Sequence, residues 1–406
     1  MQKNNIMANQ IKYYPVDNGD QSLITVEENS YSTTILVDCN IRESSKGDED
    51  PTQFDVKSDL IVSLKKRMVN DVDLVPYIDI FILTHGDDDH LHGFEKNFFQ
   101  GDPRNYKKKN KDNGEILIDV LWFSPMVMGT ATNDDEKCFN REAKRRIQLH
   151  RDKSAAKDLP GNRIVIVGYD GNEDLHGLGL VSYVPGQVVT RFNDRDLKTF
   201  SIFIHSPYQH QLTDDEVDKN RVSVVFQARF KSNAASTEFS TLAMFSGDAD
   251  HVAWATILDK TKRHNNDTAQ QALKWDLFMA PHHCSWTFFN DTPQEDNPDP
   301  VKTSLEVLDN KRGIAKVIAS SKEILNNDDN PPHFKAKGQY VKKVKEENFL
   351  NTATAVKKGK TPQPIIFDIT AQGPMKPKKQ EGSASAAGGA ALGAINQPSS
   401  YGSKAL

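Results

Sequence analysis

The run T-H-G-D-D-D-H-L-H-G at residues 84–93 constrains the fold of this chain more than any other ten residues. It follows Y-I-D-I-F-I-L, a nearly continuous apolar run that is typical of a buried strand. The end of such a strand holds side chains at fixed positions, and a tight loop there can turn several imidazoles and carboxylates toward one point. A D-D-D run usually means a solvated acidic loop, but two flanking histidines at a strand end favour a metal site. The candidate ligands are His85, Asp87, Asp89 and His90.

Three further apolar runs end in the same kind of polar group. The first, F-S-I-F-I, ends in His205; the second, T-L-A-M-F-S-G, ends in Asp248. The third, D-L-F-M-A-P, ends in His282 and His283. Each ending has a simple explanation by itself, as an edge histidine, a turn or a loop. Together they predict one shared site, because ligands in layered α/β folds bind in the crevice beyond the strand ends.

The rest of the chain predicts an α/β fold with many strands. Residues 11–38 read as three short strands separated by turn residues, which indicates an antiparallel start to a sheet. The apolar spacing at residues 57–69 predicts a helix directly before the buried strand, so we expect helices layered on two facing sheets. Charge-dense insertions at about residues 102–113 and 134–157 interrupt this pattern, and the second is rich in helix-forming residues.

One folded domain and one tail are expected. Residues 1–380 hold all the predicted strands, whereas residues 381–406 are rich in Gly, Ala and Ser and predict a disordered tail. The formal net charge of −5 is too mild to indicate a polyanion or a membrane surface as partner through bulk charge. Only three cysteines occur, and no apolar run is long enough to span a membrane. These features favour a cytoplasmic protein without a membrane partner.

The histidine and aspartate pattern resembles that of the metallo-β-lactamase superfamily, whose signature is a strand followed by T-H-x-H-x-D-H-x-G-G. His85, Asp89 and His90 match this signature, whereas Asp87 replaces its second histidine and His92 its first glycine. The segments V-D-N-G-D-Q-S-L-I and I-L-V-D-C-N are similar to the opening strands of the family. The resemblance implies an α/β fold built as a four-layer αββα sandwich, with a hydrolase domain over residues 1–380.

Within this superfamily, the chain is most similar to the branch that contains the hydrolase domain of the DNA-uptake protein ComEC. That branch has a later histidine-proline step, an N-x-x-S-x-V strand, a G-D-A strand end and a closing H-H-G-S. The corresponding segments here are H-S-P at residues 205–207, N-R-V-S-V-V at 220–225, G-D-A at 247–249 and H-H-C-S at 282–285. The order of the motifs is that of the family.

The resemblance implies a site for two divalent metal ions, Zn²⁺ or Mn²⁺. The expected ligands are His85, Asp87 and His205 for the first ion, Asp89, His90 and His283 for the second, and Asp248 as a bridge between both. The expected catalytic residues are Asp89, Asp248 and His282. Because Asp87 offers a hard oxygen in place of an imidazole nitrogen, the site moves from strict zinc toward manganese, iron or a mixed pair.

The sequence leaves the last metal ligand open. His283 is the preferred ligand, with His282 behind it or acting on the leaving group. In relatives such as the tRNA-processing ribonuclease Z, the last histidine follows one further βα step, which here nominates His333 as the alternative ligand. The competing interpretation of His333 is a loop histidine beside two prolines. Asp38 corresponds to the buried aspartate that orients the site in the family.

The expected reaction is hydrolysis by a water that two metal ions activate, most simply of a phosphodiester, as in a phosphodiesterase or nuclease. Basic segments at residues 104–111 and 141–151 would attract nucleic-acid phosphates, with Tyr106 and Trp122 available for base contacts. Solvated basic surfaces are the alternative meaning of these segments. Two other classes stay open because the fold does not select the substrate. They are a hydrolase of a small ester, lactone or cyclic nucleotide, and a metal-stabilised binding module without catalysis.

Overall fold

The computed structural model describes residues 9–43, 53–129, 131–168, 175, 177–208, 219–264, 267–292, 298–355 and 360–377. Met1–Lys376 form one structural unit, and Pro377–Leu406 form a second, of which only Pro377 is described. The predicted tail, residues 381–406, lies outside the described residues. Within the described part of the chain, no helix has both the length and the apolar character needed to cross a membrane.

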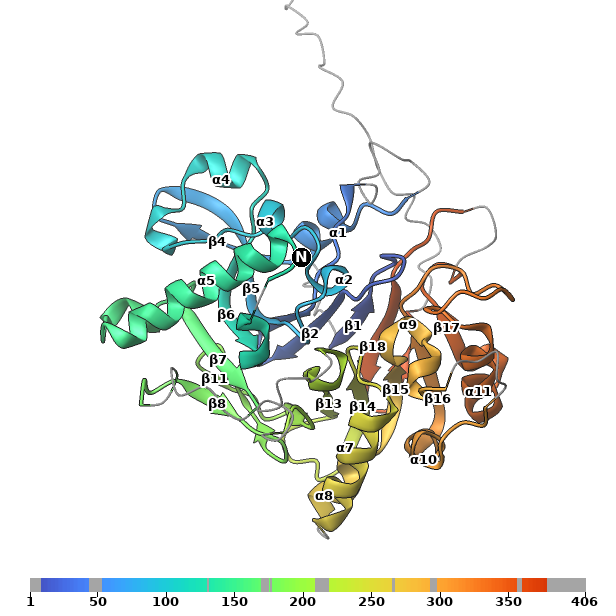
Figure 1. The fold of residues 1–406 in the computed structure, drawn as a ribbon. Helices are drawn as coiled ribbons and strands as arrows, with labels where there is room; N and C mark the ends of the chain where they lie inside the picture. The colour runs from blue at the N-terminus through green and yellow to red at the C-terminus, as the bar shows by residue number, and fades with distance from the viewer. Residues whose placement is uncertain are drawn as a thin grey trace, which may run out of the picture. The chain divides into compact units, whose positions relative to one another are not determined.

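The first sheet has the strand order β19-β18-β1-β2-β3-β5-β6-β7-β8, with β4 paired to β5 (Figure 1). The strands β1, β2 and β3 are antiparallel, as the sequence predicts, and β3, β5, β6, β7 and β8 are parallel. The bounds are β1 Gln10–Tyr13, β2 Ser22–Glu28, β3 Tyr31–Val37, β4 Lys65–Val69, β5 Val72–Ile82, β6 Leu117–Phe123, β7 Arg163–Val167, β8 Val181–Tyr183, β18 Ile365–Thr370 and β19 Gly373–Met375.

The second sheet has the strand order β17-β16-β15-β14-β13-β12-β9. Neighbouring strands are antiparallel from β9 to β14 and parallel from β14 to β17. The bounds are β9 Val188–Val189, β12 Phe200–Ile204, β13 Phe226–Lys231, β14 Phe239–Phe245, β15 Trp275–Met279, β16 Lys311–Ala319 and β17 Phe349–Asn351. Two short strands, β10 Arg191–Phe192 and β11 Arg195–Asp196, pair with each other.

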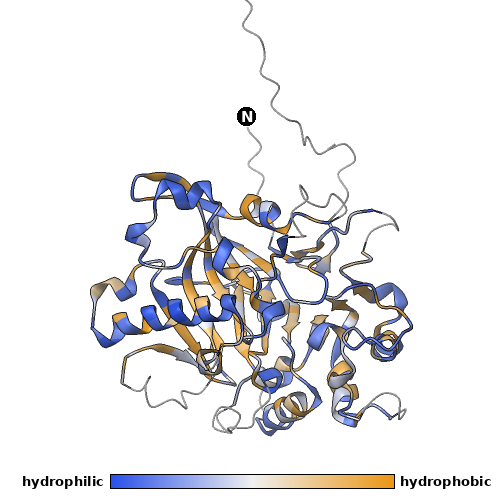
Figure 2. Cartoon of the chain, turned by 45° about the horizontal axis from the view of Figure 1, so that its top comes forward, coloured by the Kyte–Doolittle hydropathy of each residue, from blue (hydrophilic) through white to orange (hydrophobic). Residues whose placement is uncertain are grey.

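One apolar core lies between the two sheets. Ile80 and Ile82 of β5 enter it from the first sheet, and Phe226 of β13 and Phe245 of β14 enter it from the second. The ring of Tyr13 in β1 stacks on Phe245 with the centroids 6.0 Å apart. The sheets therefore pack face to face, and Figure 2 shows that hydrophobic residues gather on their strands.

Helices cover the outer face of each sheet (Figure 1). On the first sheet, Phe139 of α5 (Asp134–Arg151) packs against Phe81 with the ring centroids 6.3 Å apart. On the second, Trp254 of α7 (His251–Arg263) packs against Phe278 at 5.7 Å. The other α-helices are α1 Val56–Ser63, α2 Asp88–Leu91, α3 Phe94–Asn97, α4 Lys108–Asp112, α8 Asp267–Ala272, α9 Pro281–Cys284, α10 Lys302–Asp309 and α11 Phe334–Val344. The architecture is mixed α/β with two facing sheets.

Of the two helices that the sequence predicts, one is confirmed and the other holds only in its first half. The helix predicted within residues 134–157 is confirmed as α5. The helix predicted over residues 57–69 is wrong in its second half, because α1 ends at Ser63 and β4 begins at Lys65. In β4, partly buried and exposed residues alternate, as in a strand with one solvent-exposed face. The partly buried Lys65 forms an ion pair with the buried Asp79 at 2.7 Å. Pairing with β5 therefore prevails over the helical spacing.

Candidate metal centre

The candidate site lies where β5, β14 and β15 end. The chain after β5 leads into α2, and the chain after β15 leads into α9; β14 and β15 are parallel neighbours, so their ends meet. The side chains that come together are Asp20, His85, Asp87, Asp89, His90, Asp248, His282 and His283. Four of them, Asp20, His90, Asp248 and His283, are buried, with potential ligand atoms within 4.8 Å of one another. The structure thus gathers every predicted ligand except His205.

The carboxylate of Asp248 is the centre of this group. Its Oδ2 lies 3.5 Å from Nε2 of His85 and 3.6 Å from Nε2 of His282. Its Oδ1 lies 3.0 Å from Nε2 of His90 and 3.7 Å from Nε2 of His283. Four imidazoles are therefore divided in pairs between the two oxygens of one buried carboxylate.

His90 and His283 are each held by the ring nitrogen that points away from Asp248. Nδ1 of His90 lies 2.8 Å from the buried carboxylate of Asp38, and Nδ1 of His283 lies 3.1 Å from the backbone oxygen of Ser320. Both oxygens only accept, so each Nδ1 carries a proton. In the neutral rings both Nε2 atoms then have lone pairs, and these atoms lie 3.3 Å apart. Two lone pairs at this distance repel each other unless a cation lies near both.

His85 is held in the same way. The hydroxyl of Thr84 donates its proton to Asp38 at 2.7 Å, so its oxygen is free to accept from Nδ1 of His85 at 3.1 Å. Nε2 of His85 then presents a lone pair to Asp248. This atom has no hydrogen-bond partner among the described residues, and neither does Oδ1 of Asp248, which His90 approaches without hydrogen-bond geometry.

His282 faces Asp248 directly and does not sit behind His283. The hydroxyl of Thr287 donates to Ser285 at 3.0 Å, so that it accepts from Nδ1 of His282 at 3.2 Å. The side chain of His282 is 21% exposed, whereas that of His283 is fully buried. His282 therefore offers a lone pair to the Oδ2 side of Asp248 from the more open part of the site.

Two further aspartates lie near the imidazoles, one on each side of Asp248. Oδ2 of Asp87 lies 3.6 Å from Nε2 of His85, and its other oxygen lies 3.5 Å from Nζ of Lys219. Oδ2 of Asp89 lies 3.0 Å from Nε2 of His283. Imidazole nitrogens and carboxylate oxygens are the ligand atoms that zinc and manganese bind, and Nε2 of His85 has no hydrogen-bond partner among the described residues. The residues present therefore fit divalent cations.

The carboxylates give the site a strongly negative charge. Burial opposes protonation of His85 and His283, but Asp248 and the adjacent aspartates raise the pKa of His85 to about 9 and that of His283 to about 10. Burial also opposes ionisation of Asp248, yet the imidazoles, His90 foremost, hold its pKa well below the usual value. With no cation bound, the cluster retains protons that a divalent cation would displace.

Asp20 belongs to the site and was missed as a functional residue. Its Oδ1 lies 3.3 Å from Nδ1 of His283, and its backbone nitrogen donates to the backbone oxygen of Asp89 at 3.1 Å. Since it meets the ring nitrogen that faces away from Asp248, it orients His283 in the way that carboxylates orient metal-binding histidines. The sequence did contain a signal for this residue, because Asp20 is the last residue of V-D-N-G-D, a segment that is similar to a family motif.

His205 was predicted as a ligand of the first metal, and the structure corrects this. Ile202 and Ile204 of β12 enter the core between the sheets, so alternation turns His205 to the outer face of the second sheet. There its Nε2 lies 3.0 Å from the backbone oxygen of Ala272 at the end of α8. Burial, then the charge of Arg229, lowers the pKa of His205 to about 3.

His333, the alternative ligand, lies at the start of α11. Its Nδ1 accepts from the backbone nitrogen of Ala336 at 3.4 Å, and its ring packs against Trp286 with the centroids 5.8 Å apart. Its backbone nitrogen donates to the oxygen of Cys284, which is the residue after His283. His333 therefore caps a helix and supports the loop that carries the two site histidines.

The aromatic residues proposed for base contacts are not available for them. Tyr106 is 1% exposed and donates its hydroxyl proton to the backbone oxygen of Glu115, and Trp122 is 2% exposed and stacks on Phe192. In the second basic segment, Arg146 is buried and bonded to Glu142. Pairing within these segments reduces the charge that they offer to a nucleic acid.

No protein-family model matches this chain, and no curated protein matches it. The resemblance to the metallo-β-lactamase superfamily therefore rests on the motifs alone.

Proposed function

We propose that this chain is a metal-dependent hydrolase with the four-layer αββα fold of the metallo-β-lactamase superfamily, and that it cleaves a phosphodiester. One observation carries the proposal: four imidazoles, each held through Nδ1, direct Nε2 toward the two oxygens of the buried Asp248. Without a cation these rings retain protons, since the pKa of His85 is raised to about 9 and that of His283 to about 10, and a divalent cation would displace those protons.

Two divalent ions, Zn²⁺ or Mn²⁺, would bind on the two sides of Asp248. The residues that would hold the first ion are His85, Asp87, His282 and Oδ2 of Asp248. The residues that would hold the second ion are Asp89, His90, His283 and Oδ1 of Asp248. His282 thus takes the place in which the motif order had put His205.

Metal ions in such a pair lower the pKa of a bound water and stabilise negative charge on the transferring group. The residues of the chain hold the site rigid: Asp38, Thr84 and Asp20 fix three of the four rings through their Nδ1 atoms. The catalytic groups of this proposal are Asp89, Asp248 and His282.

The exposed side of the site favours an anionic substrate. Asp87, Asp89 and His282 have side chains that are 38%, 32% and 21% exposed, whereas the other site residues are nearly buried. Lys219 lies on this side, 3.5 Å from Asp87 and 3.4 Å from the buried Glu136, and is 41% exposed. Its ammonium group is placed to meet a phosphodiester oxygen, an interaction that a neutral ester or lactone would not use.

A small phosphodiester, such as a cyclic nucleotide, is the second candidate substrate beside a nucleic acid. The specific observation in its favour is the internal pairing of the basic segments, where Arg104 binds Asp102 and Lys108 binds Asp112. Cytoplasmic localisation remains an expectation from the sequence.

The test is to incubate the full chain with bis-p-nitrophenyl phosphate, a cyclic nucleotide, plasmid, single-stranded DNA and RNA, in Zn²⁺ or in Mn²⁺. Metal-dependent cleavage of a polymer supports a nuclease, and cleavage of the small esters alone supports a small-molecule phosphodiesterase. Binding of two metal ions with no cleavage of any substrate would contradict the proposal and favour a binding module. The matched control is Lys219→Gln, which should raise KM for the anionic substrates and leave the metal content at two.

A further inference from the structure

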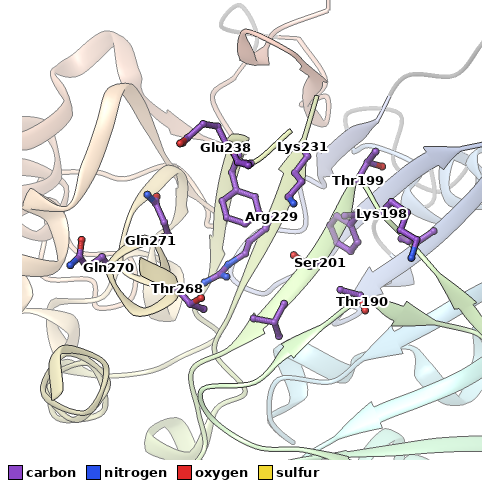
Figure 3. A pocket seen from close by; sticks show the side chains of 15 residues that line it. Thr190, Lys198, Thr199, Ser201, Arg229, Lys231, Glu238, Thr268, Gln270 and Gln271 are labelled. Carbon is purple, nitrogen blue, oxygen red and sulfur yellow. The ribbon is translucent and has the colours of Figure 1, made fainter. Parts of the chain in front are cut away.

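A cavity opens on the outer face of the second sheet, beside α8 (Figure 3). Its volume is about 530 Å³, within the range of small-molecule sites. The first residues of β12, the last of β13 and the first of β14 form its floor, and α8 forms one wall. The polar groups that line it include Thr199, Ser201, Arg229, Lys231 and Thr268.

Arg229 is the central feature of this cavity. It is 2% exposed, and none of the described carboxylates forms an ion pair with it. Its Nη2 is buried without a hydrogen-bond partner among the described residues. The guanidinium carbon lies 4.5 Å from the ring centroid of Phe203 and 5.4 Å from that of Phe239. Aromatic faces stabilise a cation in part, but they do not accept its N–H bonds.

The guanidinium is held in a fixed orientation. Gln227 donates from its side-chain nitrogen to the backbone oxygens of Gln271 and Ala272 at 3.0 and 2.9 Å, which leaves its Oε1 to accept from Nε of Arg229 at 2.5 Å. The far end of the guanidinium is therefore directed away from Gln227. Burial lowers the pKa of Arg229 to about 10, as expected for a cation with no counter-ion.

The remaining lining adds donors and a second positive charge. Lys231 follows Arg229 by two residues on the same face of β13, and Figure 3 shows both side chains extending into the cavity. Ser201 is the direct cross-strand partner of Arg229. The one carboxylate in the lining, that of Glu238, turns away from Arg229 in Figure 3.

We propose that this cavity binds a small molecule through a phosphate group held by Arg229, Lys231 and the neighbouring hydroxyls. Burying a guanidinium without a counter-ion is unfavourable, and a bound anion would offset that cost. Phosphate fits better than carboxylate because it carries a charge of about −2 and three acceptor oxygens, which match two cations and several donors.

The site is separate from the metal centre and does not depend on the proposed hydrolase activity. The strand β14 begins at the cavity with Phe239 and leads to Asp248 at its other end. At about 3.3 Å per residue, the strand itself spans roughly 20 Å. Phosphate bound here would therefore be distinguishable from phosphate bound at the metals.

The test is calorimetric titration of inorganic phosphate into the full chain and into its Asp248→Asn variant, in which the metal centre is disabled. Phosphate should bind to both proteins, and Arg229→Gln should weaken that binding at least tenfold in the Asp248→Asn background. Acetate should bind at least tenfold more weakly than phosphate. The proposal is overturned if Asp248→Asn protein does not bind phosphate, or if Arg229→Gln leaves the affinity unchanged.

A second pair of variants covers the case in which Arg229→Gln does not fold. Lys231→Gln, at a half-buried position, should weaken phosphate binding two- to fivefold. Lys311→Gln is the matched control, because Lys311 is also half-buried and lies in the same sheet at the start of β16, away from the cavity. Equal affinities for these two variants would contradict the assignment, and equal affinities for acetate and phosphate would show that a carboxylate is the ligand.

Discussion

The second sheet carries two buried polar clusters of opposite character. The cluster around Asp248 has more carboxylates than cations, and the pKa of its His283 is raised to about 10. The outer-face cluster, which consists of His205, Gln227 and Arg229, contains no carboxylate, and the pKa of its His205 is lowered to about 3. Both histidines are almost completely buried, His283 at 0% and His205 at 1% exposure. The sign of the surrounding charge therefore decides whether a buried histidine becomes a cation ligand or a neutral structural group.

The comparison is tested most severely by Asp248→Asn. Because one carboxylate serves both sides of the site, we expect the metal content to fall from two ions toward zero and phosphodiesterase activity to fall about a thousandfold or more. Elemental analysis and turnover measure these effects.

The matched control for Asp248→Asn is Asp250→Asn. Asp250 caps α7 by accepting from Val252 and Ala253, a role that asparagine retains. This variant should keep both ions. Equal metal loss from the two variants would contradict the assignment of Asp248 as the carboxylate shared by both metal ions.

One histidine from each cluster provides the second prediction. His283→Ala should lose the second ion and reduce activity about 100-fold or more, because a ligand is removed. His205→Ala should retain both ions and lose only about 1–3 kcal/mol of unfolding free energy, because a buried hydrogen bond to Ala272 is lost. If His205→Ala strips metal and His283→Ala retains it, the two clusters have been assigned the wrong roles.

The third prediction uses the pH dependence of stability. His205 has a folded-state pKa of about 3 against an ordinary value of 6.5, so the unfolded chain binds its proton first as the pH falls. Stability from this group is therefore present above pH 6.5 and is lost between pH 6.5 and 3, by about 2 kcal/mol at pH 5. The measurement is the difference in unfolding free energy between wild type and His205→Gln; parallel pH curves would contradict a neutral buried ring.

The smallest expected effect is that of His333→Ala. This variant removes the side-chain cap of α11, at a cost of about 1 kcal/mol, and should leave two ions bound. Metal loss from this variant would place His333 in the site and favour the arrangement with one further βα step.

The contrast between the clusters also explains what the sequence could predict. Two groups of site residues, 85–90 and 282–283, are each contiguous and each follow an apolar run. The sequence could therefore predict that they meet beyond the strand ends. Arg229 stands alone in V-S-V-V-F-Q-A-R-F, and only the fold reveals that none of the described carboxylates pairs with it. The prediction for His205 was wrong because β12 is buried on both faces. An apolar run of this kind does not indicate toward which face of the sheet the next side chain points.

Helices were predicted less well than strands. The pattern did not indicate α7, although Trp254, Ile257, Leu258 and Thr261 have helical spacing and Asp250 precedes them as a cap. The apolar residues at 60, 61, 64 and 68 suggested one long helix, but Met68 is 67% exposed on β4. Local spacing is a weaker signal than strand pairing where a short segment can join a sheet edge.

The loop that carries the site histidines has an unusual backbone. His282, His283 and Cys284 have φ values of 48°, 52° and 70°, three successive residues in the left-handed region, and Cys284 stands where the similar H-H-G-S motif has glycine. Each such residue costs about 1–3 kcal/mol, so this segment is poised to open before the rest of the domain. A cation held by both rings would oppose that opening. Amide hydrogen exchange at residues 282–285 should consequently slow when metal is added.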